Sequence, residues 1–437
     1  MNKENIIRYY SKDVVLDAMI KHAKNKEVAV KYLDGGFGKR PDVLLYPGDV
    51  VEHAKKGAVS FHASEELWDN PLLLKPDMRK RELDEHRIGF DLIIDIDCPV
   101  FDYSKIAAEL IIKAIKQHGV NAVSVKFSGN KGFHIGIPFE AFPSHVGADD
   151  FPDAVKNVAE YLIDYVKEDF GKRVLEFEGN VVEVARKSGV DVKRLVKDKV
   201  FVPDCLLKVD TMLISSRHLY RMPFSLHEKS WLVSLPLRLK DVSEFRREHA
   251  VPDAVESFEE VVFLERNAER GEAKRLFDFA LSFVIGKRMK QIEAESEKDS
   301  EVKLIRFRKA VRETFFPPCI KNGLKGLEDG RKRFVFCLLN FLRCVEWDYD
   351  AIRRLLYEWN ERNAEKLRER IIDYQIRYHK LKKKKIPPPN CDNEMYYKDI
   401  GICKPDAICK GIKNPLQYVR RKLDRRRSTQ GVSGISR

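Results

Sequence analysis

Apolar and polar positions divide the first half of the chain into strands and helices. The run from Gly89 to Asp97 is rich in isoleucine and leucine, which predicts a buried strand. Side chains alternate between the two faces of a strand, so one face of this segment carries carboxylates and the other is apolar. The carboxylate face holds Asp91, Asp95 and Asp97.

A predicted hairpin follows this strand. Ser104 to His118 has the periodicity of an amphipathic helix and ends at Gly119. Beyond it, two apolar segments, Ala122–Phe127 and Phe133–Pro138, flank the turn Ser128–Gly132, whose glycines permit positive φ angles. The region therefore reads as strand, helix and hairpin.

The rest of the chain is predicted to be mixed at first and helical later. Residues 13–20 and 149–169 read as helices, and residues 27–32 as a strand. Residues 250–315 are charge-rich, and the mixed-charge segment 291–301 is the expected domain boundary. Two amphipathic helices, 330–343 and 350–360, then place Cys337 and Cys344 on the apolar side, where we interpret them as core residues.

Charge separates the two halves of the chain. The 437 residues carry a formal charge of +13. Residues 301–437 hold 34 Lys and Arg against 17 Asp and Glu, whereas the first 300 residues are slightly acidic. A basic second half suggests contact with a polyanion, although a solvated charged surface accounts for part of the excess.

Composition also indicates the cellular compartment of the protein and the kind of cofactor it binds. The sequence has no apolar run near the length of a membrane span and no signal-peptide pattern at its start, so a soluble intracellular protein is expected. Six of the eight cysteines lie in residues 301–437. In an intracellular chain, this density favours a metal centre over disulfides.

The predicted strand and turn carry candidate chemistry. Two carboxylates at Asp95 and Asp97 are costly side by side unless a cation lies between them, and their oxygens select Mg²⁺ or Mn²⁺. The turn offers the Ser128 hydroxyl, the Lys131 cation and backbone N–H groups, with His134 just beyond, a combination that suits a triphosphate. Each motif alone is weak, because a basic glycine turn is more often only a turn.

A third acid follows much later. Asp210 lies on a predicted strand, Lys208–Thr211, before a segment rich in cations and histidines. Two-metal phosphoryl transfer uses about three carboxylates and cations on the leaving pyrophosphate. Taken alone, this stretch favours a simpler interpretation, with Asp210 as a cap or turn residue and His218 and His227 as ordinary hydrogen-bonded histidines.

Together these motifs resemble the catalytic subunit of archaeal and eukaryotic DNA primases. The resemblance covers roughly the first 240 residues and rests on order and spacing as well as residue type. The matching pieces are Asp95-x-Asp97, Ser128-Gly129-x-Lys131-Gly132-x-His134, Asp210, and Arg221-x-Pro223-x-Ser225-x-His227-x-Lys229.

The second half resembles the iron–sulfur domain of the primase large subunit. The matching pieces are Phe316–Cys319, Gly330–Arg333, Tyr374–Ile376, Pro389–Cys391, Cys403, Cys409 and Asn414–Tyr418. Four thiolates, Cys319, Cys391, Cys403 and Cys409, are enough to hold a [4Fe–4S] cluster. A structural zinc in a Cys₄ site is the alternative on ligand type alone.

The resemblance implies an α+β protein that fuses two primase modules in one polypeptide. An archaeo-eukaryotic primase catalytic domain, mixed α/β with an RRM-like core, is expected first, followed by a mostly α-helical iron–sulfur domain. The expected boundaries are a catalytic domain at 1–245, a helical bridge at 246–302, the iron–sulfur domain at 303–422, and a basic, disordered tail at 423–437.

The sequence departs from the family in three ways. Residues 99–204 contain no cysteine, so the zinc-binding insertion usual in small subunits is not expected. The region between about 245 and 300 leaves no room for the large subunit's N-terminal helical domain. Finally, Asn130 and Lys131 stand where cations, often arginine, occur in the family, which implies fewer triphosphate contacts.

The resemblance also implies site residues and a reaction. Asp95, Asp97 and Asp210 would hold two Mg²⁺ or Mn²⁺ ions for template-directed primer synthesis. The iron–sulfur domain would aid initiation. The implied nucleotide-binding residues are Ser128, Gly129, Lys131, His134, Arg221, Ser225 and His227.

The expected partners are a single-stranded DNA template, a primer/template duplex and nucleoside triphosphates, with no membrane. We expect a cytoplasmic, nucleoid-associated protein that acts as a monomer without a separate large subunit. Two alternatives stay open. One is a polymerase of the same superfamily that extends existing primers in repair or plasmid replication, and the other is a non-catalytic nucleic-acid-binding scaffold.

Overall fold

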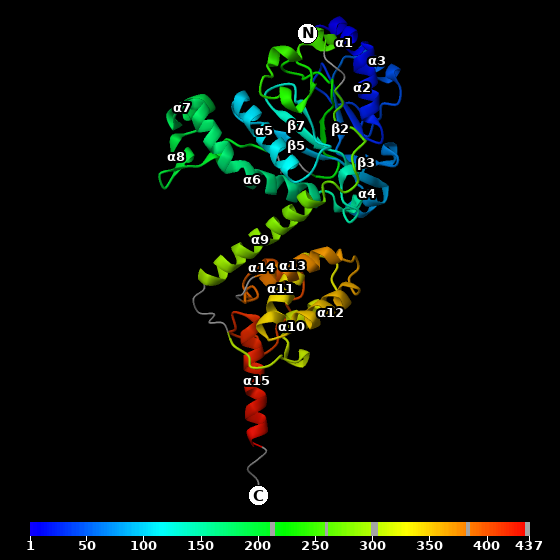
Figure 1. The fold of residues 1–437 in the computed structure, drawn as a ribbon. Coiled ribbons are helices and arrows are strands. Elements are labelled where there is room, and N and C mark those ends of the chain that lie inside the picture. The colour runs from blue at the N-terminus through cyan, green and yellow to red at the C-terminus, as the bar shows by residue number, and fades with distance from the viewer. Residues whose placement is uncertain (210–214, 258–260, 299–304, 382–384, 433–437) are drawn as a thin grey trace. The chain divides into compact units, whose positions relative to one another are not determined.

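The computed structural model describes residues 1–209, 215–257, 261–298, 305–381 and 385–432. The chain divides into two compact units, residues 1–281 and residues 282–437, which are described separately here. The first unit is mixed α+β, and the described part of the second contains helices without strands (Figure 1). This agrees with the expected mixed first half and helical second half.

The first unit alternates helices and strands. Its helices are α1 (Lys3–Tyr10), α2 (Asp13–Ala23), α3 (Pro47–Lys55), α4 (Lys80–His86), α5 (Phe101–Gln117), α6 (Asp153–Glu178), α7 (Val181–Ser188) and α8 (Val192–Leu195). Its strands are β1 (Val28–Tyr32), β2 (Ala58–Ser64), β3 (Glu66–Trp68), β4 (Arg87–Phe90), β5 (Leu92–Ile96), β6 (Ser124–Phe127), β7 (Phe133–Ile137), β8 (Val196–Lys197), β9 (Val200–Phe201), β10 (Leu219–Arg221) and β11 (Pro236–Leu237).

A four-stranded antiparallel sheet organises this unit. Its strand order is β11-β6-β7-β5, and α5 packs against both α6 and the sheet (Figure 1). In chain order the elements run β5–α5–β6–β7–α6, as the sequence pattern predicts. After α6 the chain returns to β5, where Val209 forms an antiparallel bridge with Ile96 and the Lys208 carbonyl accepts from the Asp97 N–H at 3.0 Å.

A three-stranded sheet, β1-β2-β10, completes the core of the unit. Helix α3 packs on β2, and α1 and α2 pack against α3. Between the two sheets lies a buried cluster of Ile93, Tyr220, Phe263 and Leu264. Because β10 supplies Tyr220 to this cluster, the three-stranded sheet lies beside the carboxylate-bearing face of β5.

This cluster corrects the expected start of the bridge at residue 246. Phe263 and Leu264 are each only 3% exposed, and Arg266 binds the buried Asp91. Residues 246–281 therefore belong to the first unit. The division between the two units falls inside a long helix, α9 (Lys274–Lys298). Because the chain continues as helix across the division, the change in composition along the sequence did not locate it.

The predicted strand over residues 89–97 is two strands. β4 pairs with β3, while β5 pairs with β7, and the change of partner occurs at Asp91. The Asp91 N–H donates to the carbonyl of Glu65 at 2.8 Å. A single apolar run therefore serves two sheets, which period-two patterning alone does not reveal.

The second unit is built from helices around one core. After α9 come α10 (Pro318–Gly323), α11 (Arg331–Cys344), α12 (Tyr349–Asn360), α13 (Glu369–Leu381), α14 (Glu394–Tyr397) and α15 (Pro415–Val432). Helix α11 is the centre of this core, and its Cys337 and Cys344 are buried, in agreement with the sequence interpretation.

The C-terminal tail is a correction. Residues 423–432 were expected to be disordered, but they continue α15 as helix. Arginine and lysine are good helix formers, and the first glycine beyond Pro415 is Gly431, so local propensity supports the extension. A strongly basic composition is therefore compatible with regular structure here.

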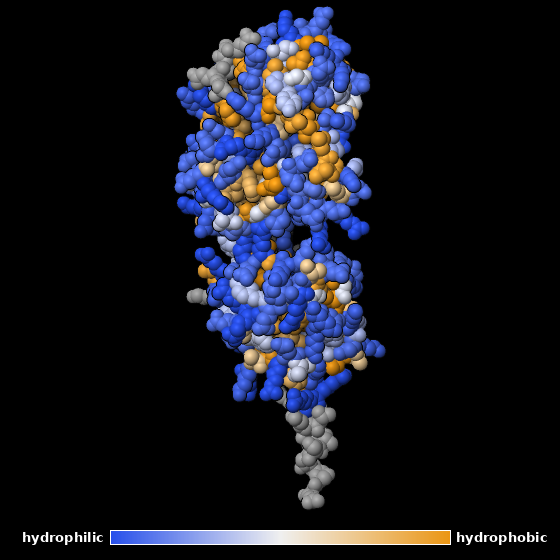
Figure 2. Space-filling view, turned by 90° about the vertical axis from the view of Figure 1, so that its right-hand side faces the viewer, coloured by the Kyte–Doolittle hydropathy of each residue, from blue (hydrophilic) through white to orange (hydrophobic). Residues whose placement is uncertain are grey.

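Among the described residues, no helix combines the length and apolar character needed to cross a membrane. The face shown in Figure 2 is mainly hydrophilic, with hydrophobic residues appearing between hydrophilic ones.

Candidate functional site

The carboxylate pair lies at the end of β5. The Asp95 side chain is 40% exposed, and its Oδ1 lies 3.4 Å from Nε2 of His134, the residue directly opposite on β7. Asp97, one residue beyond the strand, is exposed. The third predicted acid, Asp210, lies outside the described residues, but Lys208 and Val209, which precede it, are hydrogen-bonded to Asp97 and Ile96.

The Ser128–Gly132 turn approaches this strand end closely because of its glycines. Gly129 has a φ angle of 102°, a conformation that favours glycine, and a Cβ there would lie 2.8 Å from Cβ of His227. A Cβ at Gly132 would lie 2.1 Å from the carbonyl oxygen of Ile96. Glycine at both positions therefore allows the turn to lie directly beside the carboxylates.

The turn is held in shape from several sides. The Ser128 N–H donates to the Gly132 carbonyl at 3.0 Å, and the Ser230 hydroxyl donates to the Gly129 carbonyl. Lys131 is half-buried at the apex. Arg247 donates to Asn130 Oδ1 at 3.4 Å, which adds a cation beside the turn that the motif pattern does not include.

Arg221 and His227 pack against the same turn. The Arg221 guanidinium donates to the Leu226 carbonyl at 2.8 Å and to Glu228 at 2.6 Å, and its Cδ lies beside Gly129. Nδ1 of His227 accepts from the N–H groups of Lys229 and Ser230. Burial, followed by the charge of Arg221, lowers the pKa of His227 to about 4, so His227 is neutral at pH 7 with its proton on Nε2.

Ser225 does not join this group. Its side chain is fully buried, and its Oγ accepts from the N–H of Phe61 on β2 at 2.8 Å. The hydroxyl therefore joins β2 to the segment after β10. The expected nucleotide contact at Ser225 is replaced by a structural role.

Two further side chains lie beside the predicted set. Lys126, on β6, is fully buried, and its Nζ lies 2.9 Å from Nδ1 of His134. His62, on β2, pairs with Arg221 across the strands, and burial, followed by the Arg221 charge, lowers its pKa to about 3. Lys126 is not part of the predicted motifs, but it could have been found by pairing residues outward from the turn.

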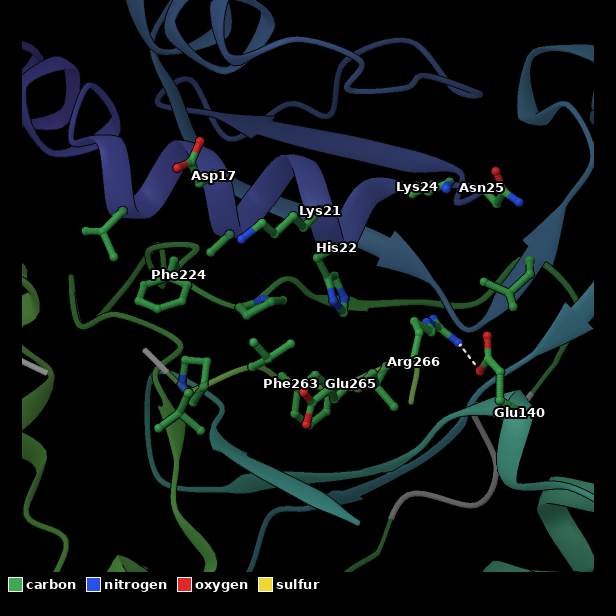
Figure 3. A pocket seen from close by; sticks show the side chains of 18 residues that line it. Asp17, Lys21, His22, Lys24, Asn25, Glu140, Phe224, Phe263, Glu265 and Arg266 are labelled. Atoms are coloured by element: carbon green, nitrogen blue, oxygen red, sulfur yellow. Dashed lines mark hydrogen bonds and ion pairs between the residues drawn. The ribbon is translucent and has the colours of Figure 1, made fainter. Parts of the chain in front are cut away.

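A large cavity lies elsewhere in the first unit. It has a volume of about 690 Å³ and is lined by α2 and by residues 261–266, with His22 and Phe263 inside it (Figure 3). The Arg266–Glu140 ion pair, at 3.1 Å, lies at its edge. None of Asp95, Asp97 and His134 lines it, so this cavity and the candidate chemistry are separate.

In the second unit the four predicted thiols line one cavity of about 120 Å³: Cys319, Cys391, Cys403 and Cys409. Burial, followed by neighbouring cysteines, raises the pKa of the Cys391 thiol to about 12 and that of Cys319 further. The walls are mainly apolar and include Pro317, Tyr397 and Ile412.

Neither set of residues is a complete metal site as described. Within the described ranges, no group of three or more His, Cys, Asp and Glu side chains is arranged to hold a metal ion. The types of donor nevertheless match distinct groups. Exposed carboxylate oxygens on β5 suit Mg²⁺ or Mn²⁺, and four thiols in an apolar cavity suit a sulfur-ligated centre.

Comparison with known proteins agrees with the position of the first site. Residues 94–239 match the DNA primase small subunit family. The chain is 28% identical over 190 residues to the DNA primase small subunit of Pyrobaculum aerophilum, covering 36% of this chain and 54% of the relative. The matched family region contains Asp95, Asp97, the turn and Arg221.

Two further similarities are more distant. The DNA primase large subunit of Pyrococcus abyssi is 28% identical over 178 residues, covering 32% of this chain and 44% of the relative. This chain thus spans about half the length of each curated relative. The solved polymerase domain of Mycobacterium tuberculosis ligase D in complex with DNA is 13% identical, with a TM-score of 0.38 over 59% of this chain and 88% of that chain, which is too distant to support an argument.

Proposed function

Because residues 94–239 match the DNA primase small subunit family, we propose that this chain is a DNA primase. The proposed reaction is template-directed nucleotidyl transfer that starts new primers from nucleoside triphosphates on single-stranded DNA. The observation that carries the proposal is the position of Asp95 and Asp97 at the end of β5, opposite His134 and beside the glycine turn, inside the matched region.

The carboxylates are the proposed metal ligands. Asp95, Asp97 and Asp210 would hold Mg²⁺ or Mn²⁺, and Lys208 and Val209, which precede Asp210 in the sequence, bind the end of β5. When bound, such ions activate the 3′-hydroxyl and neutralise charge on the triphosphate. The half-exposed Asp95 side chain keeps its oxygens accessible from solvent.

The turn and its neighbours are the proposed triphosphate site. Ser128 and the backbone N–H groups would donate to phosphate oxygens, and Lys131 and Arg221 would supply positive charge. His134, whose Nε2 faces Asp95, and His227, whose Nε2 carries its proton, are further donors. Ser225 is left out of this set because its hydroxyl is buried against Phe61.

The second unit is proposed to contribute to initiation. Its basic character, with 34 Lys and Arg against 17 Asp and Glu over residues 301–437, would bind template and triphosphate. Cys319, Cys391, Cys403 and Cys409 are the proposed ligands of a [4Fe–4S] cluster, because they line one apolar cavity. The weak similarity of this chain to a primase large subunit favours the same interpretation.

A single assay tests the proposed function. Purified full-length protein is incubated with single-stranded DNA, Mg²⁺ or Mn²⁺, and either NTPs or dNTPs, without any primer. Formation of dinucleotides and longer products supports a primase. Synthesis only when a primer is supplied would instead indicate a polymerase that extends existing ends, and no synthesis in either case would indicate a binding scaffold.

A further inference from the structure

Among the residues that the structure describes, Lys126 is a buried lysine that forms no ion pair with a carboxylate. Its side chain is fully buried on β6, and its hydrogen-bond partners are Nδ1 of His134 at 2.9 Å and Oγ of Ser234 at 2.7 Å. The rings of Phe263 and Tyr220 lie 5.4 and 5.8 Å from Nζ. Burial of an ammonium group is costly, so a lysine held this way calls for an explanation.

A second buried lysine provides the contrast. Lys26 is also fully buried and also faces Tyr220, with Nζ at 5.7 Å from the ring, but it binds the carboxylate of Asp91 at 2.7 Å. Lys26 thus forms an ordinary buried ion pair. Lys126 instead directs its hydrogen bond at the histidine that faces Asp95.

Strand register explains this arrangement. Lys126 pairs with His134 across β6 and β7, and His134 pairs with Asp95 across β7 and β5. Residues directly opposite in neighbouring strands place their side chains on the same face of a sheet. The three side chains therefore form one row that ends at the candidate metal ligand.

The donor and acceptor at each contact in the row can be assigned from the chemistry of the partners. The Ser234 hydroxyl donates to the Phe127 carbonyl at 3.0 Å, so its oxygen accepts from Lys126. At the other end, Nε2 of His134 lies 3.4 Å from the Asp95 carboxylate, which can only accept, so a neutral His134 that donates to Asp95 carries its proton on Nε2. Nδ1 then carries the lone pair and accepts from Lys126.

From this row we propose that Lys126 is a positioning residue, which fixes His134 in the tautomer and ring orientation that present its Nε2–H to Asp95 and to the phosphates of a bound nucleotide. The part of this inference that concerns the phosphates of a nucleotide rests on the proposed function. The tautomer itself is a property of the protein without substrate.

The first experiment measures that tautomer directly. Full-length protein labelled with ¹⁵N-histidine is studied by long-range ¹H–¹⁵N correlation at pH 8, and the His134 signals are assigned by their loss in His134→Gln. Wild type is expected to show the Nε2–H tautomer alone. An Nδ1–H tautomer in wild type overturns the proposal, whether or not any variant folds.

Two variants sharpen the measurement. In Lys126→Met, which keeps the length of the side chain but loses the donor, His134 is expected to populate both tautomers. In Lys126→Gln, which keeps one N–H donor, the Nε2–H form is expected to be restored in part. If Lys126→Met folds with a wild-type melting temperature and leaves the His134 signals unchanged, the proposal fails.

The second experiment asks whether Lys126 acts through His134. Nucleotidyl transfer by Lys126→Met is expected to fall roughly 10- to 100-fold, the usual cost of losing a group that orients a functional histidine. In His134→Ala, adding Lys126→Met should cost no more than about twofold, because the two residues act as one unit. If the fold-losses of activity in the two single variants multiply in the double variant, Lys126 acts independently of His134, contrary to the proposal.

The two arms separate this inference from the proposed function. If wild type lacks any transferase activity while His134 holds the Nε2–H tautomer and Lys126→Met disturbs it, the positioning role stands and the primase assignment fails. If activity requires Asp95 but the His134 tautomer does not depend on Lys126, the primase assignment stands and the positioning role of Lys126 fails.

Discussion

Asp91, between β4 and β5, and Asp95, on β5, are four residues apart, yet of the two only Asp95 is accessible to solvent. The Asp91 carboxylate is fully buried between Lys26, at 2.7 Å, and Arg266, at 2.6 and 2.7 Å. The Asp95 side chain is 40% exposed and faces His134. One short stretch of the chain thus carries a structural carboxylate and a candidate catalytic one.

Asp95→Asn should remove nucleotidyl transfer without harming the fold. The change keeps the size of the side chain but removes the charge that would hold a divalent cation, so we expect activity to fall by at least roughly 10³-fold. Because the Asp95 side chain is partly exposed, the melting temperature of the Asp95→Asn variant should stay within a few degrees of that of wild type. Primer-independent synthesis and thermal unfolding measure the two effects.

Asp102→Asn is the matched control for this change. Asp102 is an acid at the start of α5 whose salt bridge to Lys105, at 2.8 Å, is partly exposed. Its loss should leave synthesis unchanged. Full activity in Asp95→Asn would remove the basis of the proposed function.

Asp91→Asn should act on stability instead. It would leave the fully buried Lys26 without its counter-charge, and breaking a buried pair in this way costs about 3–5 kcal/mol. Urea unfolding at pH 7 measures the loss. As a control, Asp253→Asn removes a highly exposed partner of Arg8 and should change stability by less than about 0.5 kcal/mol.

The same ion pair predicts a pH dependence. Burial alone would raise the pKa of Asp91, but the charges of Lys26 and Arg266 outweigh it and hold the pKa well below its usual value. An acid with a lowered folded pKa stabilises the protein fully above its unfolded value, about 3.9, and this contribution is lost as the pH falls through the folded pKa. The stability difference between wild type and Asp91→Asn should therefore narrow below about pH 4.

Gly132→Ala should disturb the site through sterics alone. A Cβ at this position would lie 2.1 Å from the Ile96 carbonyl, which is backbone that must move. Displacing the turn from the end of β5 should reduce activity strongly and lower stability by about 1–3 kcal/mol. Gly48→Ala, where nothing lies within 4 Å, should leave both unchanged.

Serine substitutions at the four cavity cysteines test the cluster. Wild type purified anaerobically should be brown, with roughly four irons per chain, and Cys391→Ser or Cys403→Ser should lose colour and iron. Cys205→Ser, in the first unit, should retain both. A colourless wild type that contains zinc would show that the alternative Cys₄ zinc site is correct.

Local patterns predicted the site elements well. The strand, the helix and the hairpin of residues 90–138 are contiguous in sequence, so their spacing carries their geometry. The row from Lys126 to His134 also follows from this spacing, because residues pair symmetrically around a five-residue turn. The spacing of the hairpin therefore contained the information needed to pair Lys126 with His134. Lys126 was not selected because the search considered only residue types expected in a catalytic motif.

Long-range relationships were beyond the sequence. Nothing local in Asp91 shows that it is buried, since its partners Lys26 and Arg266 lie 65 and 175 residues away. The structural role of Ser225 likewise depends on Phe61, 164 residues distant. A motif can therefore place a residue near a site without revealing whether its side chain is accessible.

Helix α9 has a practical consequence for dividing the protein. Its first turns bury Leu276 and Phe277 in one unit, while Ile285 packs against the core of the other. Severing the chain near residue 281 would leave each fragment with only part of the helix. Fragments designed to express either unit alone should therefore include the whole of α9.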